Sequence, residues 1–230
     1  MEAVILAGGF GTRLKTVLQD IPKSMAPIQG KPFLEYVLLH LSRFNISNVI
    51  LCTGFRHEAI QNYFGSSFEE ISISYSQEKE PLGTGGALLK ALEGVKDQHC
   101  LALNGDSFFK APIDDLIKAH FEYDSDFTIA LKKMTDFDRY GTAKLEGSRI
   151  IAFEEKRFRK EGVINGGVYC VRKSAMTNLG LPDKFSLEKD FFEKYVSTVR
   201  MHGKVFDGYF IDIGIPEDFC RAQLGLPAFK

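Results

Sequence analysis

The residues of this chain best suited to chemistry lie in a glycine-rich segment close to its start. An apolar run from Ala3 to Ala7 leads into Gly8-Gly9-Phe10-Gly11-Thr12-Arg13, and Lys23 follows further along the chain. A glycine-rich turn lets the backbone approach a ligand closely and point its N–H groups at it. Arg13 and Lys23 add the positive charge that a polyphosphate requires. This segment therefore predicts a cradle for a nucleoside triphosphate.

The spacing of the segment excludes two common phosphate-binding motifs. A Walker A loop would end in Gly-Lys-Ser/Thr, which is missing here. A dinucleotide fingerprint would need a third glycine at the position where Leu14 stands.

Two aspartates are candidates for holding a divalent cation. Asp106 ends Asn104-Gly105-Asp106 directly after an apolar strand, and Asp212 lies near the end of the last expected strand. Ligands of open α/β sheets bind at the carboxyl ends of strands, so we expect Asp106 in the crevice beside the glycine-rich turn. Mg²⁺ needs only one or two carboxylates when phosphate oxygens supply other ligands. Taken singly, each aspartate fits equally well as a turn or strand-end residue.

An alternation of strands and helices positions these groups. We expect strands over 4–7, 48–53, 71–76, 100–104 and 127–131, and helices over 32–44, 56–64, 83–93 and 113–122. This rhythm predicts an α/β fold with a Rossmann-like, mostly parallel mixed sheet and helices on both faces. A small added β region should follow, with strands over 142–145, 150–153, 163–171 and within 206–213, and helices over 187–196 and 216–224.

The composition is that of an ordinary soluble globular protein. The chain has 230 residues, 44% of them hydrophobic and 26% charged, which argues against disorder. A net charge of −1 argues against a dedicated nucleic-acid binder. The four cysteines form no C-x-x-C pair and predict buried, reduced thiols rather than a zinc or redox site. No apolar run approaches the ~20 residues of a membrane span, so we expect a cytoplasmic protein.

The motifs together resemble those of the sugar-1-phosphate nucleotidylyltransferases. The start of the chain resembles that family's L-A-G-G-x-G-T-R-L signature followed by P-K, although Lys15-Thr16-Val17 stands where the family continues x-P-L. Gly105-Asp106 and Asp212-x-Gly214-x-Pro216-Glu217 resemble two further family motifs. The resemblance implies a GT-A-like fold in one domain over 1–230. Its nucleotide-binding half would span about 1–130 and its sugar-binding half about 131–230.

The resemblance also implies a mechanism. Asp106 and Asp212 would hold Mg²⁺, while Arg13 and Lys23 would contact the triphosphate, making Arg13, Lys23 and Asp106 the catalytic residues. The sugar phosphate would attack the α-phosphorus in line, and pyrophosphate would leave. The implied nucleotide-binding residues are Leu6, Ala7, Gly8, Gly9, Gly11, Thr12, Arg13, Lys23, Glu78, Glu80, Gly83 and Asn104.

The segment from Ser76 to Leu88 is expected to select the base. It resembles the family's P-L-G-T-A-G-A-L segment, with Gly85-Gly86 in place of Ala-Gly. Thymidylyl- and uridylyl-transferring relatives carry a Gln where this chain has Glu78. A carboxylate only accepts hydrogen bonds, and guanine offers adjacent N1–H and N2–H₂ donors, so Glu78 favours GTP. Glu80 is the alternative reader, and both glutamates also fit as solvated loop charges.

The sugar half carries further motif matches. Tyr140-Gly141, Phe153-Glu154-Glu155-Lys156 and Asn165-Gly166-Gly167-Val168-Tyr169 resemble the family's sugar-binding segments. By that match Glu155 and Asn165 would bind sugar hydroxyls, Lys156 the sugar phosphate, and the Gly141 backbone a ring substituent. Read singly, each is a common surface charge or β-turn residue. Arg157 stands where the family usually has Pro, so this loop should follow its own path.

Within the family, the short chain, Gly83-Thr84-Gly85-Gly86 and Glu78 most resemble guanylyltransferases that act on D-glycero-α-D-manno-heptose 1-phosphate. This implies GTP and a sugar 1-phosphate as partners, Mg²⁺ as cofactor, and GDP-heptose for bacterial surface polysaccharide as product. Mannose 1-phosphate with GTP and N-acetylmuramate 1-phosphate with UTP remain alternatives. Outside the class, a glycosyltransferase or a non-catalytic nucleotide sensor remains open. We expect neither a nucleic-acid nor a membrane partner, and Phe229 would suit a homodimer interface.

Overall fold

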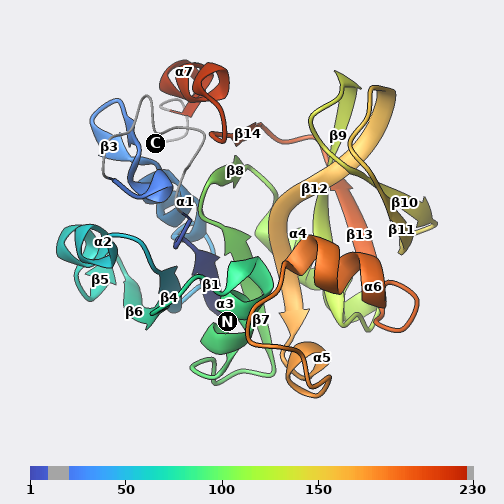
Figure 1. The fold of residues 1–230 in the computed structure, drawn as a ribbon, viewed down its shortest axis with the longest axis horizontal. Coiled ribbons are helices and arrows are strands. Elements are labelled where there is room, and N and C mark those ends of the chain that lie inside the picture. The colour runs from blue at the N-terminus through green and yellow to red at the C-terminus, as the bar shows by residue number, and fades with distance from the viewer. Residues whose placement is uncertain (10–20, 227–230) are drawn as a thin grey trace.

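The computed structural model describes residues 1–9 and 21–226, and within them a mixed sheet forms the centre of the molecule (Figure 1). This ten-stranded sheet has the order β10-β11-β13-β9-β12-β7-β1-β4-β6-β5. Its strands are β1 (Glu2–Leu6), β4 (Asn48–Thr53), β5 (Ser67–Phe68), β6 (Ile71–Gln77), β7 (His99–Asn104), β9 (Phe127–Phe137), β10 (Thr142–Glu146), β11 (Arg149–Glu154), β12 (Arg159–Arg172) and β13 (Met201–Phe206). Two small sheets pair β2 (Pro27–Ile28) with β3 (Lys31–Pro32) and β8 (Ser107–Phe109) with β14 (Phe210–Asp212).

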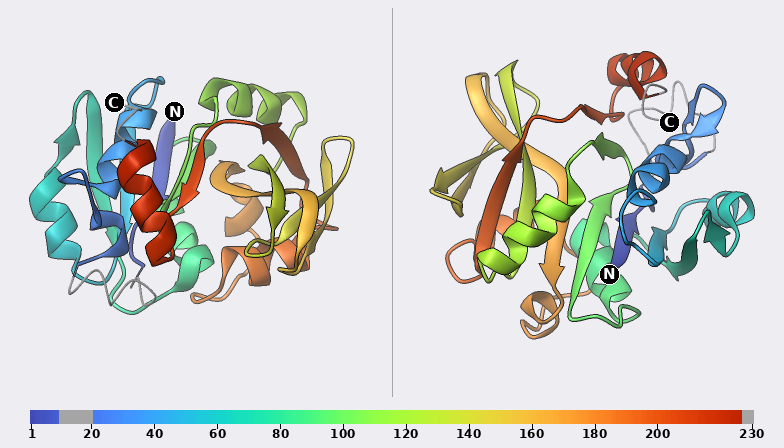
Figure 2. Two further views of the ribbon diagram at one scale, coloured as in Figure 1. Left: turned by 90° about the horizontal axis from the view of Figure 1, so that it is seen from above. Right: turned by 180° about the vertical axis from the view of Figure 1, so that it is seen from behind.

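Helices flank the sheet in both views of Figure 2. They are η2 (Lys23–Met25), α1 (Phe33–Leu41), α2 (His57–Phe64), α3 (Gly83–Leu92), α4 (Ile113–Glu122), α5 (Ser174–Thr177), the π-helix η3 (Leu187–Phe192), α6 (Glu193–Tyr195) and α7 (Pro216–Gly225). The described part of the chain contains no helix with the length and apolar character that a bilayer span requires.

Strand β1 is the central element of a parallel core. It pairs in parallel with β4 on one side and β7 on the other, and β4 pairs in parallel with β6. Successive side chains of a strand point to opposite faces. Accordingly, Ala3 and Ile5 join a core with α1, α2, α4 and α7, while Val4 joins a second core with α3 and η3. The two buried faces explain the unbroken apolar run that predicted this strand.

The predicted mixed sheet with helices on both faces is confirmed. Parallel pairing is concentrated in the first half, because β12 runs antiparallel to both β7 and β9. The helix predicted over 187–196 is confirmed as helical from Leu187 to Tyr195, but its first part is a π-helix, which the short helix α6 continues. The strand Met201–Phe206 was missed because Gly203 weakens the strand signal. A Cβ at Gly203 would lie 2.3 Å from Leu131 Cδ1, so the packing requires the glycine.

The cysteine prediction holds at three of four positions. Cys52, Cys100 and Cys170 are buried, and burial raises the pKa of each thiol. Cys220 is exposed on α7, which corrects the expectation for this residue. Its helix packs through Phe219 and Ala222, so the intervening positions face outward.

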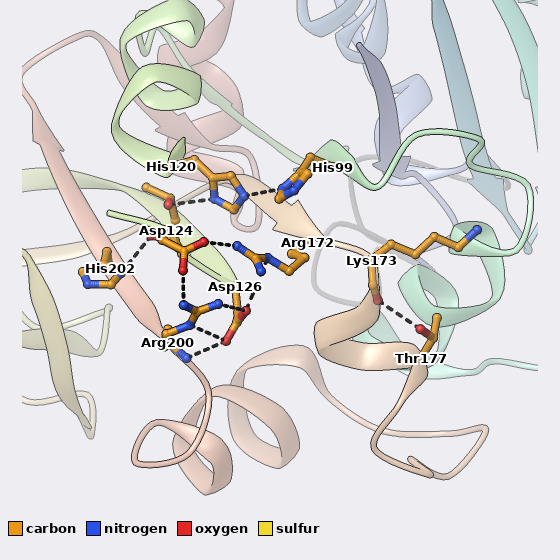
Figure 3. A network of polar contacts seen from close by, with 11 residues as sticks. His99, His120, Asp124, Asp126, Arg172, Lys173, Thr177, Arg200 and His202 are labelled. Atoms are coloured by element: carbon orange, nitrogen blue, oxygen red, sulfur yellow. Dashed lines mark hydrogen bonds and ion pairs between the residues drawn. The ribbon is translucent and has the colours of Figure 1, made fainter. Parts of the chain in front are cut away.

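A polar network ties together four elements near the amino end of β7 (Figure 3). Asp124 and Asp126 pair with Arg172 at the end of β12 and with Arg200 just before β13. His120 of α4 bridges His99 and Thr128, at 2.9 Å on each side. This network lies at the opposite end of β7 from Asn104, so it stabilises the fold rather than the crevice beside the glycine-rich turn.

The buried histidine predicts a loss of stability in mild acid. Burial first, then the neighbouring His99 and Arg172, lower the pKa of His120 to about 4. The unfolded chain binds a proton there near pH 6.5, so unfolding becomes easier as the pH falls through that range. We expect His120 alone to remove about 2 kcal/mol from the free energy of unfolding between pH 7.5 and 5. Urea titrations should show a flatter pH dependence for His120→Gln than for the wild type; equal slopes in the two proteins would contradict this.

Candidate active site

The glycine-rich turn follows the end of β1 and lies against two neighbouring segments. A Cβ on Gly8 would meet Glu78 Oε1 at 2.7 Å and the Gly54 nitrogen at 3.2 Å, so this position has room only for glycine. The close approach places a carboxylate from the end of β6 directly beside the turn. Gly11, Thr12 and Arg13, which the motif assigns to the triphosphate, lie outside the described residues.

The Asn104-Gly105-Asp106 turn follows the end of β7, the parallel neighbour of β1. The Gly105 N–H donates to the Leu6 carbonyl at 3.0 Å, and a Cβ on Gly105 would lie 2.8 Å from the same oxygen. The turn is therefore fastened to the strand that precedes the glycine-rich segment. Asp106 is held beside that segment, as parallel strands with adjoining carboxyl ends require.

Lys23 joins the two candidate aspartates. Its ammonium lies 2.7 Å from Asp106 Oδ2 and 3.3 Å from Asp212 Oδ1, and its side chain is only 11% exposed. Ser24 donates to the Ala7 carbonyl at 3.2 Å, which anchors η2 to the end of β1. Asp212 ends β14 and accepts a second hydrogen bond from the Gly214 N–H at 2.8 Å. Three segments thus converge on one charged cluster.

This cluster fits a hard divalent cation that also uses substrate oxygens. Within residues 1–9 and 21–226, no three His, Cys, Asp or Glu side chains gather around one point. Asp106 and Asp212, however, reach the same lysine ammonium and remain 45% and 27% exposed. Two carboxylates with phosphate oxygens suffice for Mg²⁺, which keeps most of its other ligands as water.

One cavity of about 370 Å³ is lined by six of the nine predicted nucleotide-binding residues that the structure describes. Its described walls are Leu6, Gly8, Gly9, Glu78, Pro81, Gly83, Thr84, Ala87, Asn104, Asp106, Glu188 and Asp212. A smaller cavity of about 160 Å³ adjoins it at Gly8 and Glu78 and includes Glu80. Ala7 is buried behind the turn. A cavity of about 420 Å³ between β9, β10 and β12 is larger, but none of these residues line it.

Glu78 is a half-buried carboxylate with one oxygen already engaged. Its Oε2 accepts from the Leu82 N–H at 2.9 Å, while Oε1 lies beside Gly8. Burial raises the pKa of Glu78, against the opposing effects of the Leu82 N–H and the Lys90 charge. The hydrogen bond to Leu82 orients the side chain, leaving Oε1 for a ligand in the cavity.

The predicted sugar-binding residues are less closely grouped. The Asn165 side chain donates to Tyr169 Oη and accepts from the Gly167 N–H, at 2.9 Å each, so it also shapes its own turn. Glu155 and Lys156 are exposed between β11 and β12, and neither lines a described cavity. Gly141 packs against the Glu154 carbonyl, which a Cβ would approach to 2.7 Å.

Thr84 and Glu188 are polar residues of the cavity wall to which the sequence motifs assign no individual role. Thr84 and Glu188 are 104 positions apart, and the Thr84 hydroxyl donates to Glu188 Oε2 at 3.0 Å. Asn104 was assigned to the nucleotide, and its Oδ1 is buried with no hydrogen-bond donor among the described residues. No local spacing signals the first pair, because the contact joins α3 to η3.

The glycines of Gly83-Thr84-Gly85-Gly86 make this contact possible. A Cβ on Gly85 would lie 2.2 Å from the Phe185 ring, and a Cβ on Gly86 would lie 2.0 Å from the Asp183 carbonyl. Gly85 also donates its N–H to the Phe185 carbonyl at 3.0 Å. The departure from the Ala-Gly of the resembled family thus has a steric cause.

Comparisons with known proteins agree with this geometry. Residues 2–228 match the family model described as nucleotidyl transferase. The chain is 47% identical to D-glycero-alpha-D-manno-heptose 1-phosphate guanylyltransferases from Aneurinibacillus thermoaerophilus, over 97% of both chains, and from Campylobacter jejuni, over 95% of this chain and 97% of the relative. The crystal structure of HddC from Yersinia pseudotuberculosis complexed with GMP-PN superposes with a TM-score of 0.88 at 35% identity, covering 100% of this chain and 99% of the other.

The steric role of Gly85 predicts that Gly85→Ala lowers the stability of the protein, although Gly→Ala in a helix usually raises it. Gly→Ala in a helix ordinarily stabilises a protein by about 1 kcal/mol. Here the added methyl would collide with Phe185, so we expect Gly85→Ala to lower the free energy of unfolding by about 1–3 kcal/mol. Chemical denaturation of a double-mutant cycle with Phe185→Leu should show a smaller loss when the smaller side chain is present. Stabilisation by Gly85→Ala alone would rule out the collision.

Proposed function

The chain belongs to the nucleotidyl transferase family, and on this basis we propose that it transfers GMP from GTP to D-glycero-α-D-manno-heptose 1-phosphate. The products are GDP-heptose, a precursor of bacterial surface polysaccharide, and pyrophosphate. The observation that carries this proposal is the wall of a single cavity. Glu78 lies in that wall together with Asp106 and Asp212, whose carboxylates Lys23 joins. Such a cavity suits a guanine and the phosphates of the same nucleotide.

In the proposed reaction, an oxygen of the sugar phosphate attacks the α-phosphorus of GTP. A new P–O bond forms as the bond between the α-phosphorus and the bridging oxygen of pyrophosphate breaks. The backbone of the glycine-rich turn and the cations Lys23 and Arg13 align and neutralise the triphosphate. Asp106 and Asp212 would hold Mg²⁺, which withdraws charge from phosphate oxygens as a Lewis acid.

The remaining parts of the proposal concern the sugar and the setting. Gly141, Glu155, Lys156 and Asn165 would bind the sugar phosphate, as their motifs imply. Since Glu155 and Lys156 are exposed, a movement of the loop between β11 and β12 toward the cavity is part of this assignment. We place the reaction in the cytoplasm, where GTP is available.

A substrate panel tests the proposed function. Purified protein with Mg²⁺ would be offered GTP, UTP, ATP or dTTP, each with heptose, mannose or N-acetylmuramate 1-phosphate, and pyrophosphate release would be measured. We expect the highest kcat/KM for GTP with the heptose 1-phosphate. A preference for mannose 1-phosphate would change the assigned sugar from heptose to mannose. Activity confined to UTP would overturn the assignment of guanine as the base. No activity with any pair would favour a nucleotide sensor.

The carboxylate pair predicts a large loss of rate without a loss of fold. Asp106→Asn and Asp212→Asn should each lower kcat by about 10²–10³, because each removes one of the two carboxylates that would hold the Mg²⁺ neutralising the reacting phosphate. Pyrophosphate release under saturating GTP measures the effect. Asp207→Asn is the matched control, since Asp207 is 92% exposed and pairs only with Lys132 among its described contacts. Equal rates for the two site variants and the control would contradict the assignment.

Glu78 predicts the choice of base. Glu78→Gln should lower kcat/KM for GTP by about 10- to 100-fold, because an amide nitrogen or a weaker acceptor would face the guanine donors. The ratio of kcat/KM for GTP to that for UTP should fall in steady-state assays. Glu80→Gln tests the alternative reader, and a larger change in this ratio for Glu80→Gln than for Glu78→Gln would transfer the role to Glu80.

A further inference from the structure

A fourth acidic residue, Glu188, lies in the wall of the active-site cavity beside Glu78, Asp106 and Asp212, and it has no role in the proposed mechanism. Its Oε2 accepts from the Thr84 hydroxyl at 3.0 Å and from the Ser186 hydroxyl at 3.1 Å. The Thr84 oxygen itself accepts from the Leu187 N–H at 2.9 Å. The carboxylate is therefore held in one orientation by two hydroxyl groups before any substrate arrives.

The segment that carries Glu188 is built to reach the cavity. The Phe185 N–H donates to the Leu82 carbonyl at 3.0 Å, and the Phe185 carbonyl accepts from Gly85. The three glycines of the facing α3 segment leave room for this backbone. Glu188 then lies in the first turn of η3, a π-helix, and π-helical turns occur frequently at functional sites. The packing of the Phe185 segment on α3, together with the π-helix η3, places the side chain of Glu188 at the cavity.

The charge of Glu188 restricts what it binds. A carboxylate only accepts hydrogen bonds, and it repels phosphate. Three other carboxylates, of Glu78, Asp106 and Asp212, already lie in the same cavity wall, so a fourth one there suits a neutral donor such as a hydroxyl group. Both substrates of the proposed reaction carry hydroxyl groups, on the ribose and on the sugar.

The surroundings of Glu188 favour the sugar. Phe192, which lies in the same π-helix as Glu188, packs against the buried ring of Tyr169 with the ring centroids 5.5 Å apart. Burial first, and then the charge of Glu188, raise the pKa of Tyr169. Tyr169 accepts from the Asn165 side chain at 2.9 Å, and Asn165 belongs to a segment that resembles the family's sugar-binding motif. Glu188 therefore lies toward the residues assigned to the sugar.

We propose that Glu188 is a specificity-determining residue that accepts a hydrogen bond from a hydroxyl group of the sugar 1-phosphate. This assignment rests on the proposed function and adds a contact that none of the family motifs in the chain supplies. Thr84 and Ser186 position the carboxylate, and the Gly85–Phe185 contact holds the helix that carries it. The same carboxylate would discriminate against sugars that lack the contacted hydroxyl group.

A double-mutant-type cycle, which combines variants of Glu188 with deoxy analogues of the sugar 1-phosphate, tests this contact. Wild type and Glu188→Gln would be assayed with GTP and the heptose 1-phosphate or its monodeoxy analogues. Removing the contacted hydroxyl should cost the wild type about 10- to 100-fold in kcat/KM, as for a hydrogen bond to a charged group. The same removal should cost Glu188→Gln clearly less, and KM for GTP should stay within about twofold. Glu188→Ala should abolish the difference, while exposed Glu193→Gln should behave as wild type.

Each outcome decides between specific alternatives. If every deoxy analogue costs Glu188→Gln and wild type the same factor, the sugar contact is excluded. If the coupling appears instead with 2′-deoxy- or 3′-deoxy-GTP, Glu188 binds the ribose and the assignment to the sugar is overturned. If wild type shows no turnover with any sugar 1-phosphate, the proposed function itself fails. Unfolding midpoints of the variants separate a lost contact from a damaged fold, because the amide of Gln retains an acceptor for Thr84 and Ser186.

Discussion

A single buried ammonium organises this site. Lys23 lies 83 positions from Asp106 and 189 positions from Asp212, and it reaches both carboxylates. Two carboxylates that both reach one ammonium group lie close together, and without a cation between them they would repel each other in this partly desolvated cleft. The lysine therefore fixes the distance between the end of β7 and the end of β14. A divalent cation on the same carboxylates would use a spacing that the protein already maintains.

Close backbone packing makes the cluster possible. Gly8 allows the first turn to lie against Glu78, and Gly105 allows the Asp106 turn to lie against Leu6. Gly85 has the same effect, because the Phe185 ring packs directly against it and Glu188, three residues later, then lies at the cavity. Each of these glycines thus stands where a neighbouring segment lies too close to leave room for a Cβ atom. The positions of the glycines in the sequence therefore reflect close packing between segments as well as phosphate binding.

Parallel topology explains why much of the site was predictable. Apolar runs predicted strands over 4–7 and 100–104, which the structure shows as Glu2–Leu6 and His99–Asn104, and parallel pairing then required Gly8 and Asp106 to be neighbours. Contacts that no local pattern encodes were missed, such as Thr84 with Glu188 and the strand containing Gly203. The π-helical turn of η3 carries the apolar spacing of an ordinary helix, so its hydrogen bonding was not foreseeable. The sugar loop with Glu155 and Lys156 stays a prediction, because its role depends on contacts with a substrate.

The most direct test of this account is a crystal structure of the protein with Mg²⁺ and a non-hydrolysable GTP analogue. We expect one cation coordinated by Asp106 and Asp212, with the α-phosphate beside Lys23 and the guanine edge at Glu78. A triphosphate bound away from the glycine-rich turn would contradict it. So would a cation that binds neither aspartate, because the lysine cluster would then be only a structural ion pair.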